Sequence, residues 1–112
     1  MADSGAGAPG SGGYGTPMHY GVTMFMTDRT IGPAALARAV EERGLHSLYI
    51  PEHTHIPVSR RTPPPTGDAE LKDEYKRTLD PIVALAVAAG VTERILLGTG
   101  IALIAQREPI VT

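Results

Sequence analysis

The clearest structural signal in the chain is the stretch Ser47-Leu-Tyr-Ile-Pro-Glu-His-Thr-His55. Residues 47–50 are apolar and β-prone, as in a buried strand. Pro51 ends this strand, because proline cannot donate a hydrogen bond to the ladder of a central strand. The ionisable side chains of Glu52, His53 and His55 follow directly, so they form a dense polar cluster at the end of a predicted strand.

The residues before this strand predict a strand and a helix. Residues 20–26 are apolar at almost every position, which is typical of a strand buried on both faces of a parallel sheet. Pro33 suits the first position of a helix that continues over residues 34–43. Gly44 tolerates a left-handed backbone, so it is predicted to end this helix in a Schellman turn with Leu45 folded back on Val40.

The residues after it begin with a long polar connection. Residues 52–79 include Pro63-Pro64-Pro65, and a connection of this length is typical of a functional or disordered segment. A helical turn is predicted within residues 71–77. Asp80-Pro81 then starts a helix, with the aspartate as N-cap, and residues 82–89 are apolar nearly all round, which predicts burial between two layers.

A third buried strand is predicted over residues 94–104, and residues 109–112 are typical of the first turn of another helix. Strands and helices therefore alternate, which predicts right-handed crossovers and a parallel sheet. Ligands bind such sheets beyond the carboxyl ends of the strands, whether the sheet is open or closed into a barrel. Three segments occupy these positions: residues 26–28, 52–55 and 99–106.

Composition excludes several classes of protein. The chain has 112 residues, a formal net charge of -2 and no cysteine, so a basic nucleic-acid footprint, a disulfide framework and a thiolate site are all excluded. No apolar run approaches the ~20 residues that span a bilayer, so neither a membrane nor a nucleic acid is a predicted partner. Residues 1–17 are rich in glycine, alanine and serine and lack a signal peptide, which predicts a disordered tail, a folded part over residues 18–112 and a cytoplasmic location.

The strand-end cluster has more than one interpretation. Histidine is the side chain whose proton moves near neutral pH, so His53 is the main candidate for acid–base chemistry. If the chain stays extended through Thr54, His53 and His55 point the same way and could hold a divalent metal. A metal site needs a third ligand and a metal-bound water besides two histidines, so no metal is predicted. Hydrogen bonds from the imidazoles to loop backbone remain the alternative, above all for His55.

The third predicted strand contains Leu97-Gly-Thr-Gly-Ile101. Glycine inside a strand marks a bend or a close approach of backbone to a ligand. The pair is not a dinucleotide fingerprint, because it lacks the third glycine and precedes no helix N-terminus. A strained peptide beside a flat ligand and a bulge that adjusts the twist of the sheet are both open.

Several motifs in order resemble the N-terminal part of the luciferase-like monooxygenase superfamily, and in particular its members that use the deazaflavin coenzyme F-420. The resemblance covers residues 20–112, and it rests on Ala39-Val-Glu-Glu-Arg-Gly-Leu-His-Ser-Leu-Tyr49, Pro51-Glu-His-Thr-His-Ile-Pro57, Thr78-Leu-Asp-Pro81, Thr92-Glu-Arg-Ile95, Leu97-Gly-Thr-Gly-Ile101 and Gln106-Arg-Glu-Pro109.

This resemblance implies a TIM-type (β/α)8 barrel that carries out hydride transfer between F-420 and a small organic substrate. Glu52, Gly100 and Ile101 match positions that contact the coenzyme, and His53 matches the residue that holds or moves a proton. The Gly100-Ile101 bond corresponds to a cis peptide behind the coenzyme ring. FMN is the alternative cofactor, and would make the protein an oxygen-using monooxygenase.

A complete barrel needs roughly 250 residues, so the chain is predicted to be a truncated α/β fold comprising its first three βα units. Such a piece would leave an open sheet edge and an uncovered apolar face on Leu96, Ile101 and Leu103. We therefore expect the fragment alone to be inactive. Two hypotheses stay open: a coenzyme-contacting part of an oxidoreductase, which may form homo-oligomers at full length, or a non-catalytic remnant that pairs its edge with another chain.

Overall fold

The computed structural model describes residues 17–59, 61–63, 67 and 70–110. Apart from Pro17, the predicted tail lies outside these residues, as do the last two positions of the predicted final helix. Within the described residues the chain forms three strands, two α-helices and two short 3-10 helices. In chain order they are β1 (Gly21–Thr23), α1 (Pro33–Glu42), β2 (Ser47–Ile50), η1 (Asp73–Lys76), α2 (Pro81–Ala89), β3 (Leu96–Thr99) and η2 (Ile104–Gln106).

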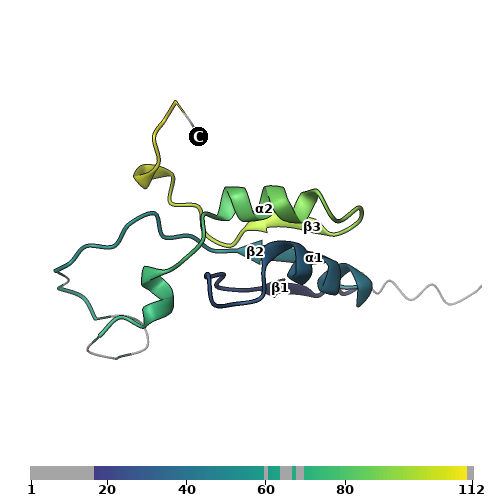
Figure 1. Cartoon of the computed structure of the whole chain (residues 1–112), viewed down its shortest axis with the longest axis horizontal. Coiled ribbons are helices and arrows are strands. Elements are labelled where there is room, and N and C mark those ends of the chain that lie inside the picture. The colour runs from purple at the N-terminus through teal and green to yellow at the C-terminus, as the bar shows by residue number, and fades with distance from the viewer. Residues whose placement is uncertain (1–16, 60, 64–66, 68–69, 111–112) are drawn as a thin grey trace, which may run out of the picture.

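The three strands form one parallel sheet in the order β1-β2-β3, which confirms the predicted parallel α/β arrangement. Val22 pairs with Leu48, and Leu48 with Leu97, so equivalent side chains lie in register across the sheet. Helices α1 and α2 pack against each other and against the strands (Figure 1). The arrangement is consistent with part of a TIM-type unit.

The core lies between these helices and the sheet. Its side chains come from the end of the β1 segment, from β2 and from the facing sides of both helices: Met26, Ala37, Leu48, Ile50, Ala84 and Ala88. Small alanines on α1 and α2 let the two helices approach the sheet closely. This packing fixes β2 in the middle of the fold and so fixes the direction in which Pro51 and Glu52 leave the sheet.

The predicted end of α1 at Gly44 and the predicted N-cap of α2 at Asp80 are both confirmed. Gly44 has φ 68°, and the N–H groups of Leu45 and Gly44 donate to the carbonyls of Val40 (3.1 Å) and Glu41 (3.0 Å), which is the Schellman pattern. Asp80 caps α2 by accepting a hydrogen bond from the N–H of Val83 at 3.0 Å, ahead of Pro81.

The predicted double burial of the strands is wrong for this chain, because helices cover only one face of the sheet. On the other face, Gly21 and Thr23 of β1 are exposed, and Tyr49 and Leu96 are 38% and 57% exposed. The expected uncovered apolar face is confirmed at Leu96 and at Ile101, which is 58% exposed. Leu103 is half-buried.

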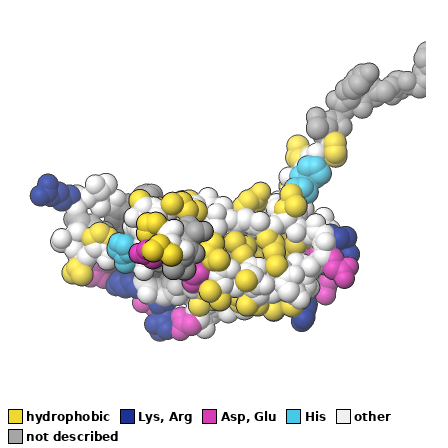
Figure 2. Space-filling view, turned by 90° about the horizontal axis from the view of Figure 1, so that it is seen from above, with side chains coloured by type: hydrophobic (Ala, Val, Ile, Leu, Met, Phe, Trp, Pro, Cys, Tyr) yellow, Lys and Arg dark blue, Asp and Glu magenta, His cyan; other side chains and the backbone are white. Residues whose placement is uncertain are grey.

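Helix α2 is also not enclosed as its composition predicts. It buries Ala84 and Ala88, but Ile82, Val83 and Val87 remain exposed on its outer side. Figure 2, seen from above, shows hydrophobic side chains gathered along the middle of the molecule, with charged groups toward its ends. Among the described residues, no helix is long and apolar enough to cross a membrane.

The third strand is shorter than predicted. β3 ends at Thr99, and the N–H of Gly100 makes a last bond to the carbonyl of Ile50 at 3.0 Å before the chain leaves the sheet. Residues 101–103 then lead into η2, and a turn follows at residues 109–110. The chain after β3 therefore folds over the carboxyl ends of the strands.

Candidate functional site

The carboxyl ends of the three strands meet at one edge of the sheet, as the sequence predicts. The long connection after β2 returns to this edge, where Thr27 and Thr78 form an antiparallel bridge and the N–H of Leu79 donates to the carbonyl of Met26 at 2.9 Å. The segment after β3 reaches the same edge from the other side. Two segments that are far apart in sequence therefore meet at this edge.

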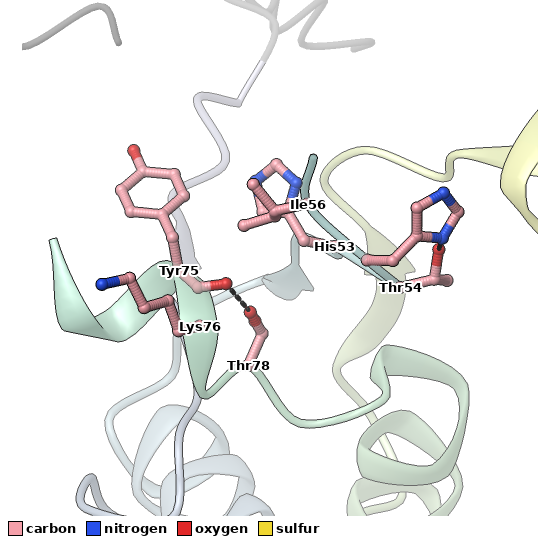
Figure 3. A pocket seen from close by; sticks show the side chains of 7 residues that line it. His53, Thr54, Ile56, Tyr75, Lys76 and Thr78 are labelled. Carbon is pink, nitrogen blue, oxygen red and sulfur yellow. Dashed lines mark hydrogen bonds between the residues drawn. The ribbon is translucent and has the colours of Figure 1, made fainter. Parts of the chain in front are cut away.

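A pocket of about 300 Å³ opens here. Its walls come from the exit of β2 and from the returning connection: His53, Thr54, His55, Ile56, Tyr75, Lys76 and Thr78. Figure 3 shows the rings of His53 and Tyr75 next to each other, with the ammonium end of Lys76 extending away from His53. The Thr78 hydroxyl donates to the Tyr75 carbonyl at 3.4 Å, and this bond stabilises the turn by which the chain leaves η1.

His53 is held in the pocket by aromatic contacts. Its ring centroid lies 5.8 Å from that of Phe25, nearly parallel to it, and 5.4 Å from that of Tyr75. Phe25 and Tyr75 also contact each other, at 4.8 Å. Within the described residues no hydrogen bond engages either ring nitrogen of His53, and the ring is half-buried.

Glu52, in contrast, is fully engaged by the protein. Its side chain is 1% exposed; Oε1 accepts a hydrogen bond from the N–H of Leu103, and Oε2 accepts from Nε of Arg107 at 2.9 Å and from Nη2 of the same guanidinium. Hydrogen bonding to Arg107 is the main reason why the pKa of Glu52 lies below its usual range, against the opposing effect of burial. Glu52 is therefore an ionised carboxylate at neutral pH.

His55 does not join His53. The chain bends at Thr54, so the extended geometry that would align the two imidazoles is absent. Nδ1 of His55 lies 3.0 Å from the Thr54 hydroxyl, and both residues are exposed. In the described part of the chain, no group of three potential metal ligands comes together.

Gly98 of β3 and Gly100, which directly follows the strand, differ in their surroundings. A Cβ on Gly98 would lie 3.0 Å from Cε1 of Tyr49, so the Tyr49 ring occupies the space beside this glycine. A Cβ on Gly100 would meet only Pro51, at an ordinary 3.6 Å. Packing within the described residues thus explains the glycine at 98 but not the one at 100.

The expected cis peptide between Gly100 and Ile101 is wrong: no described peptide bond is cis. A non-proline cis bond costs roughly 3–4 kcal/mol and persists only where surrounding structure enforces it. Here Ile101 is exposed, and the N–H of Gly100 continues the ladder with Ile50. Neither residue is packed tightly enough to hold a cis bond.

Ion pairs fix the wall that carries Tyr75. The Arg77 guanidinium binds Asp28 through two nitrogens, with Nε 2.7 Å from Oδ1, and this contact lowers the pKa of Asp28. Arg29 binds Asp73 at 2.9 Å. These pairs tie both ends of η1 to the turn after β1, and so hold Tyr75 next to Phe25.

Phe25, Tyr75 and Arg107 are site residues that the sequence did not single out. Phe25 lies within an apolar run and Tyr75 within a polar connection, so neither carries a local signal. Arg107 occurs in one of the quoted motifs, but only its distant partner Glu52 reveals its position.

The fold and this edge define a class: a βαβ protein with a pocket at the carboxyl ends of parallel strands, where such folds bind their ligands. The family model "Luciferase-like monooxygenase" matches residues 27–112, and the chain belongs to this family.

The chain is also similar to three curated proteins described as uncharacterized: Rv0953c and MT0980 of two Mycobacterium tuberculosis strains and Mb0978c of Mycobacterium bovis. Each is 54% identical over 95 residues, which is 83% of this chain and 34% of the relative. The chain thus spans about a third of the length of these relatives. No solved structure matches it significantly.

Proposed function

We propose that this chain is the coenzyme-contacting part of an oxidoreductase that transfers hydride between the deazaflavin F-420 and a small organic substrate. Family membership supports the class of chemistry, and a ring-lined pocket with an available imidazole at the strand ends supports the location. The proposal includes a cytoplasmic protein that completes a (β/α)8 barrel with further βα units. A homo-oligomer of that full-length protein is compatible with it.

The strand order supports the barrel. A right-handed crossover places its helix on a fixed side of the sheet, so strands added in one direction keep all helices on one face. The order β1-β2-β3 has this property, whereas a doubly wound sheet needs a reversal of strand order. The uncovered face around Tyr49 and Leu96 then corresponds to the barrel interior.

The residues present fit a planar ring system. A Cβ on Gly100 would meet Pro51 only at ordinary contact distances, so packing does not require a glycine there; close approach of a flat ligand to the backbone would account for it, and Ile101 is an exposed apolar side chain next to it. When bound, F-420 supplies a two-electron hydride carrier. His53 would hold or move the proton at a ring nitrogen, while Phe25 and Tyr75 orient its imidazole and exclude water from one side.

The pocket residue His53 carries the proposal, and its replacement tests it. In the protein expressed from the complete reading frame, His53→Gln should lower turnover at least about 100-fold, as expected for loss of a positioned proton donor or acceptor. Coenzyme affinity, measured by quenching of F-420 fluorescence, should change little. Unchanged turnover would refute the proton role of His53.

A glycine pair tests the coenzyme position. Gly100→Ala should weaken F-420 binding with little loss of stability, whereas Gly32→Ala, where a Cβ meets nothing within 4 Å, is the matched control. Binding of FMN with oxygen consumption, in place of F-420, would instead indicate an FMN-dependent monooxygenase. Binding of neither would support the non-catalytic alternative.

A further inference from the structure

We propose that Arg107 is a positioning residue for His53, and that it acts through Glu52. The inference deepens the proposed function and rests on it for its kinetic consequence. Its structural part concerns only contacts between described residues, so it can be tested separately.

Arg107 lies in the segment after β3, and its side chain extends to Glu52, just after the end of β2. Its guanidinium, only 16% exposed, binds Glu52 through Nε and Nη2, and Nη2 also lies 3.1 Å from Oδ2 of Asp80. Asp80 is at the same time the N-cap of α2. One side chain therefore links the exit of β2, the start of α2 and the segment after β3.

The same segment holds the other neighbour of His53. The hydroxyl of Thr54 donates to Oε1 of Gln106 at 2.9 Å, and the N–H of Leu103 donates to Glu52. Residues 52 and 54, on either side of His53, are thus both bound to residues 103–107. Anchoring the side chains of both neighbours restricts the backbone at His53, and with it the direction in which the His53 side chain points.

Glu52 and His53 have different surroundings. The Glu52 carboxylate binds Arg107, while the His53 ring contacts Phe25 and Tyr75 at the pocket. If Glu52 lost Arg107, a buried carboxylate would keep only the N–H of Leu103 as a donor among the described residues and would move toward solvent. Movement of residue 52 would turn the adjacent peptide and carry the imidazole out of contact with the two rings.

The chemistry of the pair argues for a positional role. Replacing a buried ion pair by apolar side chains of similar volume is often neutral for stability, so stability alone does not require it. What the pair provides is a fixed direction, because a guanidinium binds carboxylate oxygens with a rigid fork of donors. A lysine carries the same charge without this fork.

The test uses Arg107→Lys and Arg107→Met in the protein expressed from the complete reading frame. We expect kcat to fall about 10- to 100-fold, in line with a small misplacement of a reacting group. The Kd for F-420 should change less than about threefold. The matched control is Arg94→Met, because Arg94 is exposed and lies 4.0 Å from Glu41 at the opposite end of the sheet.

A direct readout does not depend on activity. Aromatic rings shift the resonances of protons above them, so the His53 ring C–H signals in the NMR spectrum report its contact with Phe25 and Tyr75. These signals should move toward those of a free histidine in the Arg107 variants and stay in place in Arg94→Met. Unmoved His53 signals would overturn the proposal even if the proposed enzyme activity were absent.

A double variant guards against loss of folding. Glu52→Met with Arg107→Met removes both charges and should fold, because no buried charge is left unpaired. The proposal predicts that this folded double variant keeps the displaced His53 signals and the lowered kcat. Native His53 signals and a native kcat in the double variant would overturn the proposal. An Arg107→Lys variant with normal kcat but with coenzyme binding weakened more than tenfold would also overturn it, because Arg107 would then be a direct ligand of the coenzyme.

Discussion

The two ends of β3 are each held by a buried or nearly buried glutamate, but in different ways. At the amino end, Oε2 of Glu41 accepts hydrogen bonds from three successive backbone N–H groups, those of Glu93, Arg94 and Ile95, at 2.9, 2.7 and 3.3 Å. At the carboxyl end, Glu52 is bound mainly by the side chain of Arg107. The first contact uses donors that any residue except proline would supply, whereas the second requires one particular side chain.

This difference agrees with the different roles of the two ends of the strands in a parallel βα sheet. The amino ends serve stability, and the carboxyl ends carry the site. Near Glu41 the chain turns tightly, with the Schellman turn at Gly44 close by in sequence. Contacts at both ends join segments far apart in the chain, 52 residues for Glu41 and Glu93 and 55 for Glu52 and Arg107, but beside Glu52 lies the pocket lined by His53.

The largest expected effect is that of Glu52→Gln on stability. Among the described residues, the variant leaves the largely buried Arg107 side chain with only the half-exposed Asp80 as an ionic partner. We expect a loss of about 3 kcal/mol in the free energy of unfolding, at the low end for a broken buried pair. Urea denaturation of this chain measures it, with the exposed Glu42→Gln as control. A loss no larger than that of the control would remove the distinction between the two glutamates.

A smaller effect is expected for Glu41→Gln at the other end. The amide oxygen still accepts hydrogen bonds from the same backbone N–H groups, although more weakly than a carboxylate does. The midpoint of urea denaturation should therefore fall less than in Glu52→Gln. The opposite ranking of the two midpoints would show that the amino end depends more strongly on its charge.

Lowering the pH should reveal the contribution of both carboxylates to the free energy of unfolding. The pKa of Glu41 is lowered chiefly by the backbone N–H of Arg94, and that of Glu52 chiefly by Arg107. A lowered folded-state pKa gives stability that is present above the unfolded value, about 4.3, and lost as pH falls through the folded value. Unfolding midpoints measured from about pH 6 downward should fall with pH, and less steeply in Glu52→Gln than in the original chain. Parallel curves would contradict the lowered pKa of Glu52.

The smallest expected effect separates the two glycines of the β3 region. Gly98→Ala places a Cβ 3.0 Å from the Tyr49 ring, which must shift by a few tenths of an ångström; we expect a cost of about 1 kcal/mol or less, because this ring is partly exposed. Gly100→Ala should stay within about 0.5 kcal/mol of the original chain. Thermal unfolding of the two variants gives the comparison, and equal losses would contradict it.

Local signals in the sequence predicted much of the fold. Strand Ser47–Ile50, the Asp80 cap and the Gly44 turn depend on neighbouring residues, and all three are confirmed. The enclosure of residues 82–89 was not predictable, because composition alone does not say which elements lie against a helix. Ile82 and Val83 are therefore exposed where the pattern favours burial.

The candidate site was predictable in position but not in its contacts. The alternation of strands and helices placed Glu52 and His53 at the correct edge. The pair between Glu52 and Arg107 spans 55 residues, and no short-range pattern indicates it. The ring contacts of His53 likewise depend on where the long connection returns to the sheet.

The return of the connection after β2 to the edge of the sheet determines which part of the pocket wall can vary. Bonds from Thr78 and Leu79 to the segment after β1 anchor the end of the connection between β2 and α2, so this end is held in place by its own contacts. Each doubling of a flexible loop adds only about 0.6 kcal/mol to the cost of closing it. Insertions ahead of η1 would therefore reshape the outer wall of the pocket while Tyr75 and His53 stay where they are.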